Sequence, residues 1–190
     1  MSDLRIAVLV GSLRNDSFNG QLARALVRLA PERLVLEQVR IDDLPLYNQD
    51  DDGRPAEPVR RLKTQVAAAQ GVIFATPEYN RSIPGVLKNA IDHGSRPYGQ
   101  SVWAGKPAGV LGISIGAMGT SMAQQHLRNV LAYLDMPTLG QPEVYLQAKH
   151  GFFTEAGDIA ADDTKQFLQK WLETYATWVR EHCDRTIVNT

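Results

Sequence analysis

Hydrophobic residues follow two alternating patterns along the chain, short apolar runs and longer stretches with helical spacing. Residues 6–10 read Ile-Ala-Val-Leu-Val, and an unbroken run of this kind predicts a strand buried on both faces of a parallel sheet. Residues 34–41 alternate in part, so we expect that strand nearer an edge. The predicted strands cover 6–10, 34–41, 71–76, 107–114 and 142–146.

Between these runs, apolar residues recur three or four positions apart, which predicts helices. The first follows residue 19, with apolar positions from Leu22 to Leu29, and another begins near residue 83 with Pro84 in its first turn. Residues 42–58 are rich in Asp, Gly and Pro, so we expect a solvated connection there. The helices after the first are expected over 59–70, 83–91, 121–134 and 163–182.

Strands that alternate with helices imply right-handed crossovers and a doubly wound, three-layer α/β/α sheet. In such folds the ligand binds beyond the carboxyl ends of the strands, where the strand order reverses. We therefore expect the loops 11–19, 77–84 and 114–120 to converge at one edge. The whole chain, 1–190, is predicted to form one domain, with 185–190 as a disordered or added tail.

The first of these loops, 12–19, is polar and leads from a strand into a helix. That geometry directs free backbone N–H groups and the positive end of a helix at one point, which suits an anion such as phosphate. Ser12, Ser17 and Asn19 can donate hydrogen bonds, and Arg14 can add a charged fork. The alternative is a tight turn in which Ser17 caps the helix and Arg14 points into solvent.

The phosphate ligand predicted by this loop is a terminal monophosphate. A dinucleotide fingerprint needs three glycines, of which only Gly11 is present, and a P-loop needs a lysine where Asp16 and Ser17 stand. A loop that offers hydroxyls, one amide and one guanidinium fits the single phosphate of FMN better.

The second loop, 77–84, lies between two prolines and is therefore rigid. A rigid loop can offer N–H and C=O groups to the edge of a flat heteroaromatic ring with little loss of entropy. Tyr79 either packs near such a ring or is a half-buried loop aromatic, and Glu78 either lines the site or fixes the loop through its own hydrogen bonds. The glycines of 116–120 either admit a ligand close to the backbone or mark a flexible turn.

Together these motifs carry a family resemblance. Gly-Ser-Leu-Arg followed by Ser-Phe-Asn over 11–19, and Pro-Glu-Tyr-Asn-Arg-Ser-Ile-Pro-Gly-Val-Leu-Lys-Asn-Ala-Ile-Asp over 77–92, resemble the NAD(P)H-dependent FMN reductase family, above all its bacterial chromate and quinone reductases. The resemblance spans residues 4–145 and implies a flavodoxin-like fold, noncovalent FMN and a homodimer or homotetramer. It implies that the phosphate is held by Ser12, Arg14, Ser17, Phe18 and Asn19, the isoalloxazine ring by Pro77, Glu78, Tyr79, Asn80 and Ser82, and the other side of the ring by Ser114 and Gly116.

The chain departs from the family pattern after residue 92. Many relatives have an aromatic residue there, whereas this chain has His93 and Gly94. The role of His93 stays open, and Arg81 is assigned only a place near NAD(P)H or an anionic acceptor. The resemblance also makes Arg128 and Glu143 candidates for pairing across a subunit interface.

The implied activity is an FMN-dependent NAD(P)H oxidoreductase that reduces quinones, and further chromate, azo compounds or free flavin, in a ping-pong cycle. The flavin N5 carries the chemistry, so no catalytic side chain is assigned. The alternatives are a flavodoxin-type electron carrier, which a net charge of −1 does not favour, and a nonenzymatic flavin-binding protein. The choices between NADH and NADPH and between dimer and tetramer stay open.

Composition limits the partners, the location and the other kinds of chemistry that the sequence predicts. A net charge of −1 predicts neither nucleic acid nor an anionic membrane as a partner, and no apolar run approaches the roughly 20 residues of a membrane span. The single cysteine, Cys183, suits a reducing compartment, and residues 1–5 lead straight into a predicted strand, so we expect no signal peptide and a cytoplasmic location. Four scattered histidines predict no metal site, and Ser114 lacks the nucleophile-elbow context of a hydrolase.

Overall fold

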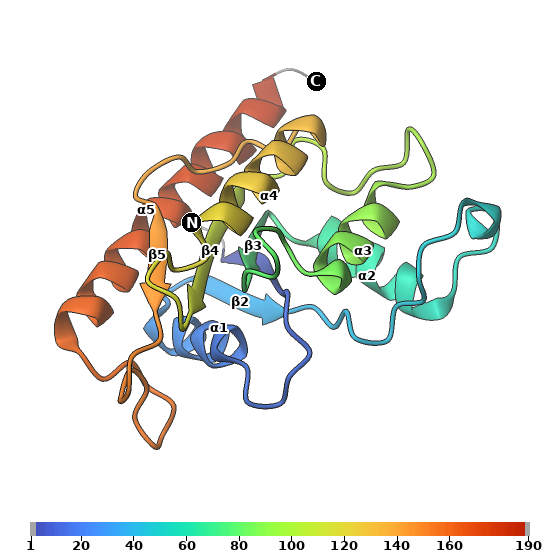
Figure 1. The fold of residues 1–190 in the computed structure, drawn as a ribbon. Coiled ribbons are helices and arrows are strands. Elements are labelled where there is room, and N and C mark those ends of the chain that lie inside the picture. The colour runs from blue at the N-terminus through green and yellow to red at the C-terminus, as the bar shows by residue number, and fades with distance from the viewer. Residues whose placement is uncertain (1–2, 189–190) are drawn as a thin grey trace.

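The predicted doubly wound α/β sheet is confirmed. The computed structural model describes residues 3–188, and their side chains as far as residue 183. Five parallel strands lie in the order β2-β1-β3-β4-β5, the flavodoxin-like order, with β2 at the edge as its partial alternation predicts (Figure 1). The strands are β1 (Leu4–Val10), β2 (Leu34–Gln38), β3 (Gly71–Ala75), β4 (Ala108–Ser114) and β5 (Val144–Gln147).

Helices cover both faces of this sheet and complete the three layers (Figure 1). One face packs against α1 (Phe18–Leu29) and α5 (Asp162–Val188), and the opposite face against the other three α-helices. None of the helices within residues 3–188 has the length and apolar character needed to cross a membrane. The other three are α2 (Glu57–Ala68), α3 (Gly85–Ser95) and α4 (Ser121–Tyr133).

The strand β1 shows why an apolar run specifies a central position. Ile6 and Val8 belong to the core beneath α1 and α5, whereas Ala7 and Leu9 belong to the core on the other face. Successive side chains of a strand point to opposite faces, so a strand with helices on both sides needs apolar residues at every position.

Several boundaries differ from those predicted. The helix α3 begins at Gly85, so Pro84 occupies the N-cap position instead of the first turn, and α3 continues to Ser95 instead of residue 91. The strand β2 ends at Gln38 instead of residue 41, and β5 covers Val144–Gln147, so it leaves out Pro142, which has no N–H to donate to a ladder. The helix α5 extends to Val188, residues 189–190 lie outside the described part, and the tail over 185–190 stays a prediction.

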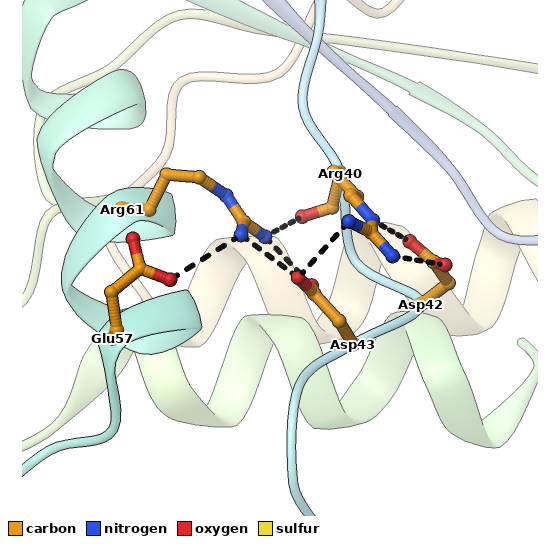
Figure 2. Close-up of polar contacts among 5 residues, drawn as sticks. All are labelled: Arg40, Asp42, Asp43, Glu57 and Arg61. Carbon is orange, nitrogen blue, oxygen red and sulfur yellow. Dashed lines mark hydrogen bonds and ion pairs between the residues drawn. The ribbon is translucent and has the colours of Figure 1, made fainter.

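The predicted connection over 42–58 ends two residues early, since α2 begins at Glu57 and ends at Ala68 instead of covering 59–70. Residues 42–56 are irregular as predicted, apart from a short 3-10 turn, η1 (Gln49–Asp51), but they are not simply solvated. Figure 2 shows that Arg61 of α2 holds the Asp43 carboxylate through two hydrogen bonds, of 2.7 and 2.8 Å. The same guanidinium lowers the pKa of Asp43 below its ordinary value of 3.8. Arg40, just beyond β2, pairs with Asp42 at 2.7 Å.

The same connection is also attached to α3. Asn89 receives a hydrogen bond from Tyr47 N at 2.8 Å and donates one to Pro45 O at 2.8 Å. His93 Nε2 lies 2.8 Å from Pro45 O, so a residue that departs from the family pattern fixes this connection to α3. Long-range hydrogen bonds therefore hold the segment that composition alone describes as solvated.

Candidate functional site

The three predicted loops converge at the carboxyl edge of the sheet, where β1, β3 and β4 lie side by side (Figure 1). Gly11 N donates to Ala75 O at 2.9 Å, which joins the ends of β1 and β3. Thr76 N donates to Leu111 O at 3.0 Å and joins β3 to β4 in the same way. The side chains that follow these strands therefore face one shared region.

In the first loop the capping role of Ser17 is confirmed, and it coexists with the features that favour an anion. Ser17 Oγ accepts a hydrogen bond from Gly20 N at 3.2 Å. Within residues 3–188, the N–H groups of Phe18 and Asn19 in the first turn of α1 have no protein acceptor. Arg14 is exposed and forms no ion pair among the described side chains. A helix N-terminus with two free donors and a nearby cation suits a phosphate.

The side chain of Asn19 has a different task from the one predicted for it in the phosphate site. It is 2% exposed, its Nδ2 donates to Ile113 O at 2.9 Å, and Ile113 N donates to its Oδ1 at 3.1 Å. Both ends of the amide thus hold α1 to β4. What Asn19 can offer a phosphate is its backbone N–H.

The second loop contains a tight turn over 79–82. Tyr79 N donates to Ser82 O and Ser82 N donates to Tyr79 O, both at 3.0 Å. The two central residues have positive φ, 53° at Asn80 and 66° at Arg81, which is the pattern of a type I′ turn. Asparagine tolerates this conformation, whereas arginine rarely adopts it.

Glu78 fixes this loop through its own hydrogen bonds, which is one of the two roles that the sequence left open for it. Its Oε2 accepts from Met122 N at 3.0 Å and from Ala123 N at 3.1 Å, in the first turn of α4. Thr120, the N-cap residue of α4, makes no side-chain cap. A carboxylate 42 residues earlier in the chain takes that role and also meets the positive end of the helix.

A second link between this loop and α4 was not predicted. Ser82 Oγ lies 2.7 Å from His126 Nδ1, and the two side chains form a hydrogen-bonded pair. In the sequence His126 is one of four scattered histidines, and nothing local connects it to a serine 44 positions earlier. Among the described residues, no group of three or more His, Cys, Asp or Glu side chains is arranged to hold a metal ion.

The glycines near the third loop differ in what they permit. A Cβ at Gly112 would lie 2.2 Å from Thr120 Oγ1 and 2.3 Å from Thr76 O, so β4 packs there against the protein itself. Gly116 is exposed, and the nearest atom to an added Cβ is Ser114 Oγ at 3.7 Å. Ser114 Oγ donates to Gly116 O at 3.3 Å, which places both predicted residues together in the loop.

Large apolar side chains are exposed on the converging loops and the first turn of α4. Such side chains are usually buried, so several at the edge of one site indicate a surface that an apolar ring can cover. The arrangement combines a helix end suited to an anion with a rigid, partly apolar surface, and these two features suit the phosphate and the ring of FMN. The exposed residues are Leu13, Tyr79, Ile115, Met118 and Met122.

Comparison with known proteins agrees with this geometry. The family model for NADPH-dependent FMN reductase matches residues 4–151. The chain is 53% identical over 178 residues to a 2-hydroxy-1,4-benzoquinone reductase of Burkholderia sp, covering 94% of this chain and 97% of that protein. It is 40% identical to an NAD(P)H-dependent FMN reductase of Pseudomonas aeruginosa, covering 94% and 96%. The solved structure of FerB, a flavoenzyme NAD(P)H:(acceptor) oxidoreductase of Paracoccus denitrificans, superposes with a TM-score of 0.90 at 41% identity, covering 94% of this chain and 98% of FerB.

Proposed function

The chain belongs to the NADPH-dependent FMN reductase family, and from this premise we propose that it is an NAD(P)H-dependent oxidoreductase that holds FMN between its three loops and reduces quinones. The observation that carries the proposal is the joining of two different kinds of surface at one edge. One is the open N-terminus of α1 beside Arg14, and the other is the rigid turn 79–82 fixed to α4.

The phosphate end of FMN would be held by the first loop. The Phe18 and Asn19 N–H groups would donate to phosphate oxygens, and Arg14 would add a charged hydrogen bond. The hydroxyl of Ser17 is free to donate because its oxygen is the atom that caps Gly20 N. Ser12, half-buried at the start of the loop, completes this set.

The ring of FMN would be held by the second and third loops. The ring would be bordered by Pro77, Tyr79, Asn80 and Ser82. Glu78 would act indirectly, by positioning that loop on α4. Ser114 and Gly116 would close the other side. When bound, the flavin supplies the two-electron redox chemistry at N5, and the protein supplies orientation and hydrogen bonds to the ring. No side chain is assigned as acid or base, and we propose that NAD(P)H and acceptor use the open ring face in turn.

The proposed acceptors are quinones, because the relatives named above include a 2-hydroxy-1,4-benzoquinone reductase. Chromate, azo compounds and free flavin are further proposed acceptors, and a cytoplasmic location is proposed with them. We also propose a homodimer or homotetramer. In support, Tyr98 and Tyr133 lie in a groove beside α3 and α4 and are 87% and 82% exposed. Arg128 and Glu143 already have partners within the chain, in Leu139 O and the Tyr145 hydroxyl, so pairing across an interface would add to these contacts.

The activity is tested by steady-state assays of the FMN-loaded protein with NADH and with NADPH against quinones, chromate, an azo dye and free FMN. We expect saturable quinone reduction. Arg14→Gln should raise the FMN dissociation constant about tenfold or more, the effect of one charged hydrogen bond. Arg60→Gln, an equal change of charge on the exposed face of α2, should leave it unchanged. A protein that binds FMN but transfers no electrons from either nicotinamide would instead be a carrier or a flavin-binding protein.

A further inference from the structure

We propose that Arg81 selects anionic electron acceptors, such as quinones that carry an ionised hydroxyl group, over neutral ones. The inference rests on the proposed function and concerns the same site. Arg81 lies at the tip of the turn between Tyr79 and Ser82, the two residues expected to border the flavin ring.

The backbone at Arg81 is the first observation. Its φ of 66° is left-handed, a conformation that glycine or asparagine adopts easily and that strains other residues. Glycine at this position would remove that cost. A strained residue at the rim of a site indicates that its side chain serves a purpose the backbone alone does not.

The surrounding contacts keep this strained turn in place. Two backbone hydrogen bonds of 3.0 Å close it, and Ser82 Oγ joins it to His126 of α4 at 2.7 Å. Glu78, the residue before Tyr79, is held by two N–H groups of α4. The Cα of Arg81 is therefore fixed relative to α4, so only its side chain is left to adapt to a ligand.

The charge of Arg81 is not neutralised by the protein. Among the described side chains it forms no ion pair and no hydrogen bond, and it is exposed. The carboxylate of Glu78, three residues earlier in the same loop, is already engaged by the N-terminus of α4. A free guanidinium thus borders the ring site on a different loop from Arg14.

The chemistry of hydroxyquinones matches this group. A hydroxyl on a quinone ring is a vinylogous acid, so it is ionised at neutral pH and its charge is shared between two oxygens. A guanidinium presents its donors in a planar fork and can bind such an anion through more than one hydrogen bond. A neutral quinone gains no charge attraction from Arg81, and the preference should weaken as salt is added.

An equilibrium experiment tests the inference without turnover. Oxidised FMN-loaded protein is titrated with 2-naphthoate and with its neutral analogue 2-naphthamide, and binding is followed through the flavin absorbance. Arg81→Gln should weaken naphthoate binding about fivefold, the upper range for an exposed ion pair, and change naphthamide binding less than twofold. Arg81→Lys should fall between, and Arg60→Gln should match the wild type. An equal effect on both ligands, or none on either, overturns the proposal.

Kinetic measurements distinguish a failure of this inference from a failure of the proposed function. The ratio of kcat/KM for 2-hydroxy-1,4-naphthoquinone to that for 2-methyl-1,4-naphthoquinone should fall about fivefold in Arg81→Gln. If both quinones are reduced with an unchanged ratio, the proposed function stands and the role of Arg81 is wrong. A rise in KM confined to NADPH also overturns it, because the anion recognised would then be the nucleotide phosphate. If neither quinone is reduced by the wild type, the proposed function itself fails.

Discussion

Single side chains hold the three loops of the site together. Glu78 joins the second loop to the start of α4, and Asn19 joins the first turn of α1 to β4 through both ends of its amide. Each replaces hydrogen bonds that water would otherwise make with backbone groups. Because these contacts connect loops that would each bind a different part of FMN, we expect their loss to weaken cofactor binding as well as stability.

Glu78→Ala should lower the free energy of unfolding by about 1–2 kcal/mol, the usual worth of a helix cap, and weaken FMN binding. Glu78→Gln keeps an acceptor oxygen but loses the charge, so its effect should be smaller. Both are measured by urea unfolding of the apo-protein and by FMN titration. Glu155→Ala, in an exposed loop, is the control. If Glu78→Ala lost the expected stability but bound FMN with unchanged affinity, the positioning role of Glu78 would be contradicted.

Among the elements, β4 and the start of α4 are packed as closely as a glycine allows. At Gly112 an added Cβ would meet Thr120 Oγ1 on one side and the backbone oxygen of Thr76 on the other. Rotation of a side chain could relieve the first contact but not the second. The end of β4 is therefore fixed against β3 and α4 at the edge where the site forms.

Gly112→Ala should destabilise the protein by about 2–3 kcal/mol or prevent its folding, because the backbone must shift to admit the methyl group. Gly116→Ala is the matched control, since the nearest atom to its Cβ is 3.7 Å away, and its stability should stay within about 0.5 kcal/mol of the wild type. Thermal and urea unfolding measure both. Equal stabilities for the two variants would contradict the close approach.

The link between the 42–58 connection and α2 makes a prediction about pH. Arg61 lowers the pKa of Asp43 in the folded state below its ordinary 3.8, so the stabilisation is complete above that value and is lost as the pH falls through the folded pKa. Asp43→Asn should cost about 1 kcal/mol at pH 7, and the difference from the wild type should shrink below pH 3.8. Asp42→Asn, whose partner Arg40 is 62% exposed, should cost less. A difference that does not change with pH in urea unfolding would show that the ion pair is not its source.

At the scale of the whole molecule, the sequence was sufficient for the sheet and for the edge where the loops meet. The apolar run over 6–10 and the helical spacing that follows it are local signals, and parallel topology then places the three loops together. The contacts that shape the site were not predictable in this way. Ser82 and His126 are 44 positions apart, and Asn19 and Ile113 are 94 apart, so no local pattern records their pairing.

Local conformation set a further limit to prediction. The turn over 79–82 has Asn-Arg at its centre instead of the usual Asn-Gly. Because arginine is not typical of a left-handed backbone, the sequence did not indicate the positive φ of Arg81. The start of α3 was predicted at residue 83 and lies two residues later, at Gly85, because the fixed φ of Pro84 suits either the N-cap or the first turn.

The central claim is that the three loops form one FMN site through which electrons pass from NAD(P)H to a quinone. The most direct measurement is anaerobic stopped-flow absorbance of the FMN-loaded protein, mixed first with NADPH or NADH and then with a quinone. The account predicts rapid bleaching of the oxidised flavin band by at least one nicotinamide and its full return on addition of the quinone. A protein that takes up no FMN, or whose bound FMN is bleached by neither nicotinamide, would contradict it.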